Sequence, residues 1–133
     1  MCDIVIADDD EAVLSLLAKR LSTAGHNVRT AKDGREALAL VRQRAPDLAV
    51  IDIIMPRCDG IETLIELRKA FPQVKVLAIS GSFSGGRLNY LGMAQRLGAH
   101  DILEKPFSGR KLLDTIAMLR HNDRTGPVRL LDH

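Results

Sequence analysis

Near its start the chain reads Ile4-Val5-Ile6-Ala7-Asp8-Asp9, an apolar run that ends in two carboxylates. An unbroken run of this length, without alternation of apolar and polar residues, is typical of a strand buried on both faces of a parallel sheet. In open parallel α/β sheets, ligands bind beyond the carboxyl ends of the strands. We therefore expect this stretch to form a strand that brings Asp8 and Asp9 to a binding edge.

Three later apolar runs also end in polar or charged side chains. These runs and the residues that follow them are Leu48–Ile51 with Asp52, Val76–Ile79 with Ser80, and Ile102–Leu103 with Lys105 two positions on. The carboxyl ends of parallel strands share one edge of the sheet. Three carboxylates, a hydroxyl and an ammonium would meet there, and that set suits Mg²⁺ and phosphoryl chemistry.

Helical patterns alternate with these runs. Apolar residues with helical spacing lie at Val13–Leu21, Ala37–Val41, Leu64–Ile65, Leu88–Leu97 and Leu112–Leu119, and a weaker, partly polar strand that suits a sheet edge lies at Asn27–Thr30. Because parallel strands joined by helices need right-handed crossovers, helices are expected on both faces of the sheet. We predict an α/β fold, a doubly wound five-stranded parallel sheet in a three-layer sandwich.

Polar residues and glycines mark the ends of several helices. The stretches Asp33–Glu36 and Asp59–Glu62 have the spacing of capping boxes at helix starts. Gly25 and Gly98 stand where two helices should end. Residues 80–87 are rich in glycine and serine and are expected to form a loop.

The composition indicates one globular, soluble domain. Its 133 residues are 46% hydrophobic, and no apolar run approaches the roughly 20 residues that span a bilayer. Cys2 and Cys58 are too few and too far apart for a disulfide framework or a zinc site. The net charge is +2, the basic residues are scattered, and aromatic residues make up 3% of the chain. We expect a cytoplasmic protein with reduced thiols, no signal peptide, no membrane contact and no direct contact with nucleic acid.

The acidic residues at the strand ends have distinct expected roles. Adjacent side chains of a strand point to opposite faces, so one of Asp8 and Asp9 should bind a metal directly and the other through water. Without metal the clustered anions repel one another, and at least one pKa should rise. Asp10 is better suited to cap the following helix than to bind metal. The competing interpretation is that Asp9 or Asp10 only caps that helix while Asp52 is solvated.

Asp52 is the candidate for a covalent role, because a carboxylate can attack phosphorus and carry an acyl phosphate. Lys105 would neutralise the oxygens of the transferring group, and Ser80 would donate a hydrogen bond to one of them. The simpler alternatives are a surface lysine and a small hydroxyl that serves packing. Pro106, which follows Lys105, is a candidate for a cis peptide bond.

Together these residues resemble the receiver domain of response regulators in two-component signalling. The likeness covers about residues 2–121 and rests on four motifs, which are Ala7-Asp8-Asp9-Asp10-Glu11, Asp52-Ile53-Ile54-Met55-Pro56 with Asp59-Gly60, Ile79-Ser80-Gly81, and Gly98-Ala99 leading to Glu104-Lys105-Pro106-Phe107. The resemblance implies a flavodoxin-like fold with strand order 2-1-3-4-5. It also implies a receiver domain over residues 1–121, followed by a short C-terminal tail over residues 122–133.

The resemblance assigns a role to each site residue. In this assignment Asp52 is the phosphoacceptor, and Ser80 and Lys105 contact the phosphoryl group. Asp9 binds Mg²⁺ directly and Asp8 binds it through water. The backbone carbonyl of Ile54 is a further Mg²⁺ ligand. The phosphoryl donor would be a histidine kinase or a histidine phosphotransfer protein. The chain would signal by contact with a downstream protein and would be no enzyme beyond self-phosphorylation and self-dephosphorylation at Asp52.

Two features depart from the family pattern. The position three residues before Lys105 usually carries an aromatic ring that moves on phosphorylation, and here that switch position is Ile102. The segment from Ser80 to Lys105 is a few residues longer than usual. A non-switching interaction module is therefore the alternative function.

A phosphohydrolase of the haloacid dehalogenase type would need a second acid two residues after Asp52, where Ile54 stands.

The partner surface and the extent of the protein remain expectations. An apolar face with Tyr90, Met93, Ile102 and Leu112 would serve a partner or a homodimer, unless these side chains belong to the core. Residues 122–133 are too few for a DNA-binding fold. We therefore expect a stand-alone receiver or relay intermediate, or a piece of a longer protein.

Overall fold

The computed structural model describes residues 2–55, 60–81 and 87–121 and, within the last range, side chains from Gly92 onwards. Four sequence expectations lie outside the described residues, namely the tail after residue 121, the cap at Asp59, most of the loop at 80–87, and the side chain of Tyr90. Among the described residues, no helix combines the length and hydrophobicity that crossing a membrane requires.

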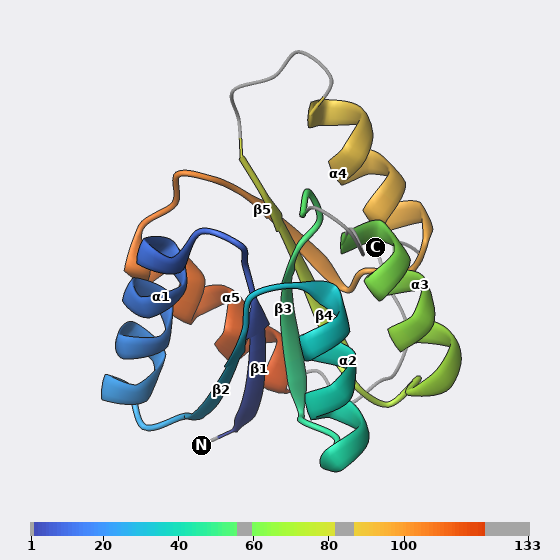
Figure 1. Ribbon diagram of the computed structural model, residues 1–133. Coiled ribbons are helices and arrows are strands. Elements are labelled where there is room, and N and C mark those ends of the chain that lie inside the picture. The colour runs from blue at the N-terminus through green and yellow to red at the C-terminus, as the bar shows by residue number, and fades with distance from the viewer. Residues whose placement is uncertain (1, 56–59, 82–86, 122–133) are drawn as a thin grey trace.

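Strands and helices alternate through the described residues (Figure 1). The strands are β1 (Asp3–Ala7), β2 (Asn27–Ala31), β3 (Leu48–Asp52), β4 (Lys75–Ser80) and β5 (Asp101–Glu104). The helices are α1 (Glu11–Thr23), α2 (Gly34–Gln43), α3 (Gly60–Ala70), α4 (Arg87–Arg96) and α5 (Gly109–His121). The five strands pair in parallel in the order β2-β1-β3-β4-β5, which confirms the expected topology.

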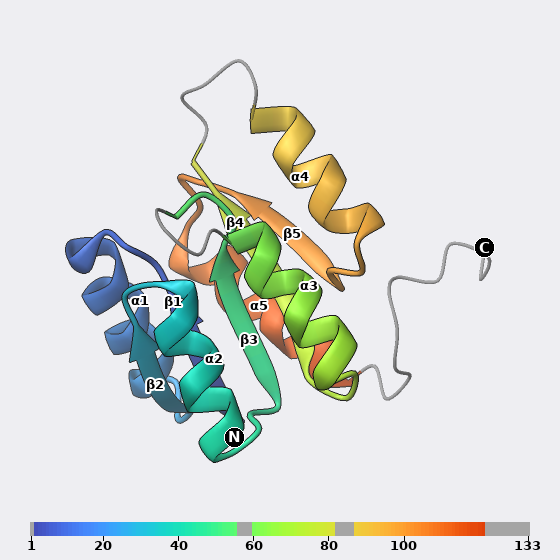
Figure 2. The same cartoon turned by 45° about the vertical axis from the view of Figure 1, so that its right-hand side comes forward.

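Two hydrophobic clusters, one on each face of the sheet, hold the layers together. One cluster joins the sheet to α2, α3 and α4, and the other joins it to α1 and α5 (Figures 1 and 2). Strand β1 contributes side chains to both clusters, because Val5 packs into the first cluster while Ile4 and Ile6 pack into the second. Full burial of one such side chain contributes roughly 1.5–3 kcal/mol. The central strands are therefore rigid supports for whatever follows their carboxyl ends.

Local signals place the helix ends as expected. The Asp10 side chain accepts hydrogen bonds from the N–H groups of Ala12 and Val13, so Asp10 is the N-cap of α1. Gly25 follows this helix with a φ of 97° and Gly98 follows α4 with a φ of 111°, a region that favours glycine. These positions confirm the helix boundaries read from the sequence.

The capping box of α2 forms with one difference. Asp33 accepts a hydrogen bond from the N–H of Glu36, as in a regular box. The Glu36 carboxylate, however, accepts from the N–H of Lys32, one residue before the cap, at 2.9 Å. The box therefore also ties down the chain that enters the helix from β2.

The apolar face expected from Tyr90, Met93, Ile102 and Leu112 does not exist as one surface. Leu112 is fully buried in the cluster with α1, whereas Ile102 packs against the cluster on the other side of the sheet. Only Met93 among the described side chains of this set is exposed. The sequence could not assign these residues to one side of the sheet, because both sides need apolar side chains from strands and helices.

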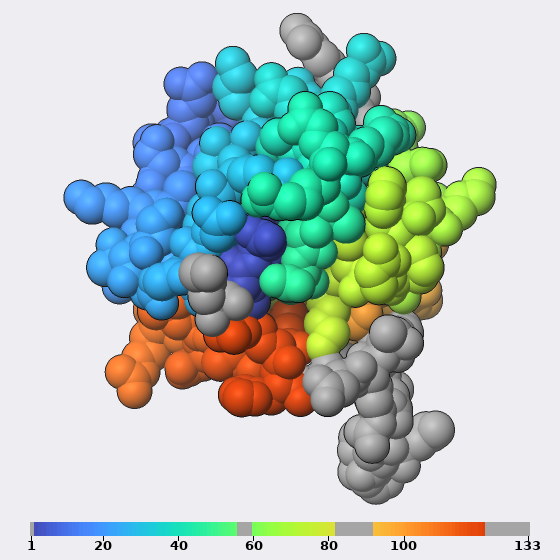
Figure 3. Space-filling model, turned by 90° about the horizontal axis from the view of Figure 1, so that it is seen from below, coloured from blue at the N-terminus to red at the C-terminus, as the bar shows by residue number. Residues whose placement is uncertain are grey.

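Figure 3 views the molecule from the end at which the strands start, whereas the residues of the expected site are at the opposite ends of the strands. A groove of about 560 Å³ lies at the end where the strands start, and its lining includes Cys2, Leu48, Lys75 and Leu119. Cys2 is a free, buried cysteine. The groove contains none of the residues expected to carry phosphoryl chemistry.

Candidate functional site

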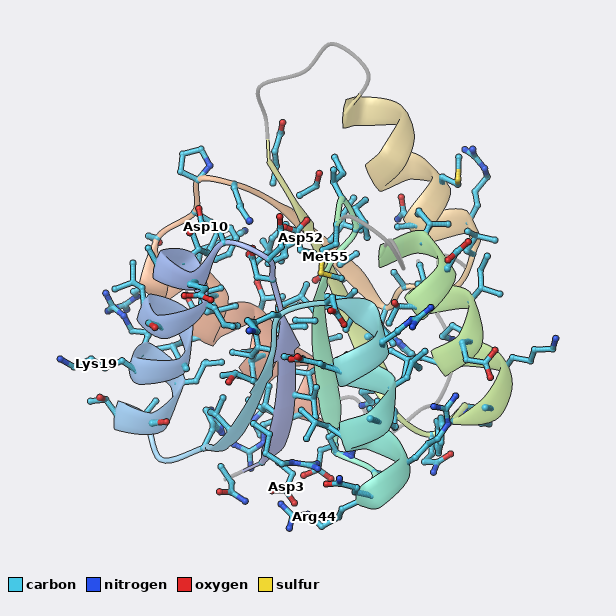
Figure 4. All side chains as sticks on the ribbon, viewed as in Figure 1. Asp3, Asp10, Lys19, Arg44, Asp52 and Met55 are labelled. Carbon is cyan, nitrogen blue, oxygen red and sulfur yellow. The ribbon has the colours of Figure 1, made fainter. Side chains whose placement is uncertain are left out.

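The strand order brings the polar strand ends together at the upper edge of the sheet in Figure 4. Asp8 directly follows β1, and Asp52 is the last residue of the neighbouring strand β3. Ser80 ends β4, and Lys105 directly follows β5. The site therefore draws one or more residues from each of four adjacent strands, as the sequence predicted.

Three carboxylates form the acidic part of the site. Asp8, Asp9 and Asp52 each offer an oxygen, and these oxygens lie within 4.8 Å of one another. Asp8 is fully buried and Asp52 nearly so, whereas Asp9 is exposed. Hard cations such as Mg²⁺ take oxygen ligands from one or two carboxylates and complete their shell with water and phosphate oxygens. The donor set and its open side at Asp9 fit Mg²⁺.

Lys105 bridges two of these carboxylates. Its Nζ donates to Oδ2 of Asp8 at 2.8 Å and to Oδ2 of Asp52 at 3.2 Å. Both acids are buried and the lysine side chain is only 21% exposed, so solvent screens these contacts weakly. The ammonium is thus held beside Asp52, where an incoming anionic group would meet it.

Backbone N–H groups fix the other oxygens of the same carboxylates. The N–H of Asp10 donates to Oδ1 of Asp8 at 2.9 Å, and the N–H of Ile54 donates to Oδ1 of Asp52 at 3.0 Å. Each buried carboxylate is therefore held by a backbone donor on one oxygen and by Lys105 on the other. The contact from Ile54 was not foreseen, because it depends on how the chain turns after β3.

The site perturbs the ionisation of its two central groups. Burial raises the pKa of Asp52 to about 6, and the charge of Asp8 adds to the rise, while the Ile54 N–H and Lys105 act against it. For Lys105, burial lowers the pKa, but the bond to Asp8 and the charges of Asp52 and Asp8 outweigh burial, so the net pKa is raised. The expected pKa rise in the acidic cluster is confirmed, although burial rather than repulsion is its main cause.

Ser80 lies at the adjacent strand end and is fully buried. Its hydroxyl donates to the backbone oxygen of Gly81 at 3.4 Å, and its own backbone oxygen accepts from the N–H of Lys105 at 2.7 Å. The Lys105–Pro106 peptide bond is cis, as the sequence suggested. Ser80 and Lys105 are therefore linked through the backbone, and neither serine contact involves a carboxylate of the site.

Ile102 is half-buried and packs against the cluster that α2, α3 and α4 form with the sheet. It follows Asp101 near the start of β5, one strand beyond Ser80. An isoleucine at this position presents a compact aliphatic side chain rather than a planar ring.

One residue that contacts the site went unrecognised as such in the sequence. Gly60, the first residue of α3, is buried against the backbone where β3 ends, and a Cβ there would overlap the carbonyl oxygen of Asp52 and the Cα of Ile53. The Asp59-Gly60 pair was visible as part of a motif. The contact itself depends on where the chain returns after its loop, which no local pattern encodes.

Known proteins match this chain in sequence. The sequence model of the response regulator receiver domain matches residues 4–117. The alkaline phosphatase synthesis transcriptional regulatory protein PhoP of Bacillus subtilis (strain 168) is 37% identical over 128 residues, which cover 93% of this chain and 51% of PhoP. The chain spans about half the length of PhoP and of similar curated relatives.

Solved structures match the fold. The receiver domain of NtrX from Brucella abortus superposes with a TM-score of 0.84 at 37% identity, covering 90% of this chain and 99% of that one. The chemotaxis protein CheY4 of Vibrio cholerae superposes with a TM-score of 0.79 at 28% identity, covering 90% of this chain and 98% of that one. Sequence and fold agree, and the chain belongs to the response regulator receiver domain family of two-component systems.

Proposed function

We propose that Asp52 accepts a phosphoryl group from a phosphohistidine on a histidine kinase or a histidine phosphotransfer protein. The observation that carries this proposal is the bridge from Lys105 to the buried carboxylates of Asp8 and Asp52. The bridge supports the assignment of Asp52 as the nucleophile, because the ammonium of Lys105 already lies beside it. This charge needs no rearrangement when an anionic phosphoryl group arrives.

In the transfer, a carboxylate oxygen of Asp52 attacks phosphorus and forms a P–O bond. The P–N bond to the donor imidazole breaks, and the imidazole, protonated on its other ring nitrogen, leaves with the electron pair as a neutral ring. Lys105 neutralises a phosphoryl oxygen, and the Ser80 hydroxyl turns from the Gly81 oxygen to donate to another. The products are an acyl phosphate on Asp52 and a free donor histidine.

Asp8, Asp9 and Asp52, with the backbone carbonyl of Ile54, would hold Mg²⁺, which when bound neutralises charge on the carboxylates and on the phosphoryl oxygens. Both oxygens of Asp8 already accept hydrogen bonds, one from Asp10 and one from Lys105. Within the part of the chain that the structure describes, the exposed Asp9 side chain accepts no such hydrogen bond. This difference favours Asp9 as the direct ligand and Asp8 as the ligand through water.

The phosphorylated domain would signal by contact with a downstream protein in the cytoplasm. An aspartyl phosphate adds about −1.5 to −2 charges and several strong acceptors, which Lys105 and Ser80 can engage. The chain spans about half the length of its curated relatives, and one of them, PhoP, is a transcriptional regulatory protein. The downstream contact could therefore be with an effector region in the same polypeptide. A second copy of this chain and a separate protein are the other candidates.

Ile102 supports a second candidate function, a receiver-like interaction module that does not switch. A half-buried aliphatic side chain in the first cluster has no ring to rotate between an exposed and a buried position. Hydrogen exchange of β5 and α4, compared between the phosphorylated and unphosphorylated protein, separates the two functions. Unchanged protection in both elements supports the module.

The direct test is incubation with Mg²⁺ and acetyl phosphate, followed by intact mass measurement beside an Asp52→Asn control. We expect a mass gain of one phosphoryl group in the wild type and none in the variant. A gain that persists in Asp52→Asn would contradict the assignment of Asp52. Steady release of phosphate from a phosphate ester without a stable mass gain would point to a hydrolase instead.

A further inference from the structure

Gly60, at the start of α3, lies against the backbone at the end of the strand that carries Asp52. A Cβ at this position would overlap two backbone groups, the carbonyl oxygen of Asp52 and the Cα of Ile53. Both are backbone atoms of buried residues, Asp52 at the end of β3 and Ile53 directly after it, so neither can turn aside as the end of a flexible side chain would. Only a residue without Cβ lets the helix start at this place.

The contact closes the loop that connects β3 with α3. Strand β3 ends at Asp52, α3 begins at Gly60, and the overlap positions lie at Asp52 and Ile53, so the two ends of the connection touch. Ile54 lies one residue beyond that contact. Its N–H donates to Oδ1 of Asp52 at 3.0 Å.

We propose that Gly60 is a positioning residue for the phosphoacceptor site, which it holds in register by letting α3 close against the backbone of Asp52 and Ile53. The proposal rests on the proposed function of Asp52. An added methyl group must push the two loop ends apart by on the order of 1 Å to reach ordinary van der Waals contact. That displacement would move the segment that contains the Ile54 N–H, which donates to Asp52, and the Ile54 carbonyl, which is the proposed Mg²⁺ ligand.

The displacement should affect chemistry more than it affects folding. A misplacement of about 1 Å at a distance from the reacting atoms can cost about 100-fold in rate. In Gly60→Ala we expect Mg²⁺ to bind about tenfold more weakly and Asp52 to gain the phosphoryl group roughly 10- to 100-fold more slowly at saturating Mg²⁺.

Two other glycines provide matched controls. Gly25 has a φ of 97°, and a Cβ there would point into open space, so Gly25→Ala introduces backbone strain far from the site. At Gly92, in α4, a Cβ would meet only the end of the Arg96 side chain, at 3.8 Å. Gly25→Ala should lower the melting temperature, and Gly92→Ala should raise it slightly because alanine favours a helix interior, while Mg²⁺ affinity stays at the wild-type value in both variants.

The experiment measures Mg²⁺ affinity by isothermal titration calorimetry and the rate of mass gain with acetyl phosphate, for wild type and the three variants below their melting temperatures. Wild-type affinity and rate in Gly60→Ala overturn the proposal, and so does an equal loss in Gly25→Ala. If the wild type binds Mg²⁺ but gains no mass, the proposed function fails, and the Mg²⁺ affinities still decide the role of Gly60.

A measurement on the wild type covers the case in which Gly60→Ala does not fold. The amide resonance of Gly60 should shift on Mg²⁺ titration with the same half-saturation as that of Ile54, while those of Gly25 and Gly92 stay in place. A Gly60 resonance that stays in place while that of Ile54 shifts overturns the proposal, as does a wild type that binds no Mg²⁺.

Discussion

The ammonium of Lys105 lies 2.8 Å from Oδ2 of Asp8, although 97 residues separate the two in the chain. The contact joins the first and last strands that contribute to the site, and Asp52 from a third strand shares the same ammonium at 3.2 Å. A single cation therefore compensates two buried carboxylates. Its removal has consequences for stability as well as for chemistry.

Replacement of Lys105 by alanine should leave the carboxylates of Asp8 and Asp52 without their cation. Because an unpaired buried acceptor costs about 1–3 kcal/mol, we expect a loss of that order in the free energy of unfolding at pH 7.5. Phosphorylation of Asp52 should slow as well. Urea unfolding measures the first effect. Lys105→Arg, which keeps the charge, should lose less, and equal losses in both variants would argue against a charge effect.

Asp52 should destabilise the fold at neutral pH. Its pKa is raised from 3.8 to about 6, so its contribution is most favourable below pH 3.8 and is lost as the pH rises through about 6. This difference in the pKa of Asp52 corresponds to at most about 3 kcal/mol in the free energy of unfolding. In EDTA, Asp52→Asn should therefore be more stable than wild type at pH 7.5. The difference in stability between the two proteins should shrink as the pH falls towards 4. A difference that does not vary with pH would show that ionisation of Asp52 is not its cause.

His100 should give the opposite pH dependence. This buried side chain accepts a hydrogen bond on Nδ1 from the N–H of Val76 at 3.0 Å, and burial, with the charges of Arg68 and Lys75, lowers its pKa from 6.5 to about 4. The stability that neutral His100 contributes is present above pH 6.5 and is lost as the pH falls towards about 4.

His100→Asn keeps an acceptor near the position of Nδ1 but has no group that titrates in this range. We expect the difference in unfolding free energy between wild type and this variant to fall by up to about 3 kcal/mol between pH 6.5 and 4. Urea unfolding across that range measures it. If the two proteins keep parallel pH profiles, His100 is not the group responsible.

Asp9 and Asp8 should respond differently when each becomes asparagine. Since Asp9 is exposed and Asp8 holds Lys105, Asp9→Asn should weaken Mg²⁺ binding with little change in stability, whereas Asp8→Asn should lower both. Calorimetric titration with Mg²⁺ and urea unfolding separate the two effects. Asp10→Ala is the control, because it weakens the N-cap of α1 and should leave Mg²⁺ affinity in place. Equal Mg²⁺ affinity in Asp9→Asn and wild type would remove Asp9 from the metal site.

Local signals in the chain were sufficient for the elements and for the strand-end residues that meet at the site. Apolar runs without alternation identify buried strands, as at Leu48–Ile51, and the cap at Asp10 and the glycine at Gly25 mark helix ends through contacts within a few residues. The rule that ligands bind at the carboxyl ends of parallel strands then places Asp8 and Asp52 at one edge. The strand and helix signals depend on neighbours in sequence, and the general rule for parallel sheets does the rest, so the sequence alone carries these features.

Features that depend on residues far apart in the chain emerged only from the folded arrangement. The sequence grouped Ile102 with Leu112 on one apolar face, yet the two side chains pack on opposite faces of the sheet. Both faces of the sheet are covered by apolar helices, so an apolar residue alone does not say which face it joins. The pKa of Asp52 is set mainly by burial, which is a property of the packed molecule rather than of its neighbours in sequence. The contact of Gly60 with the backbone of Asp52 and Ile53 exists only because α3 returns to the end of β3, and that return is a matter of tertiary packing.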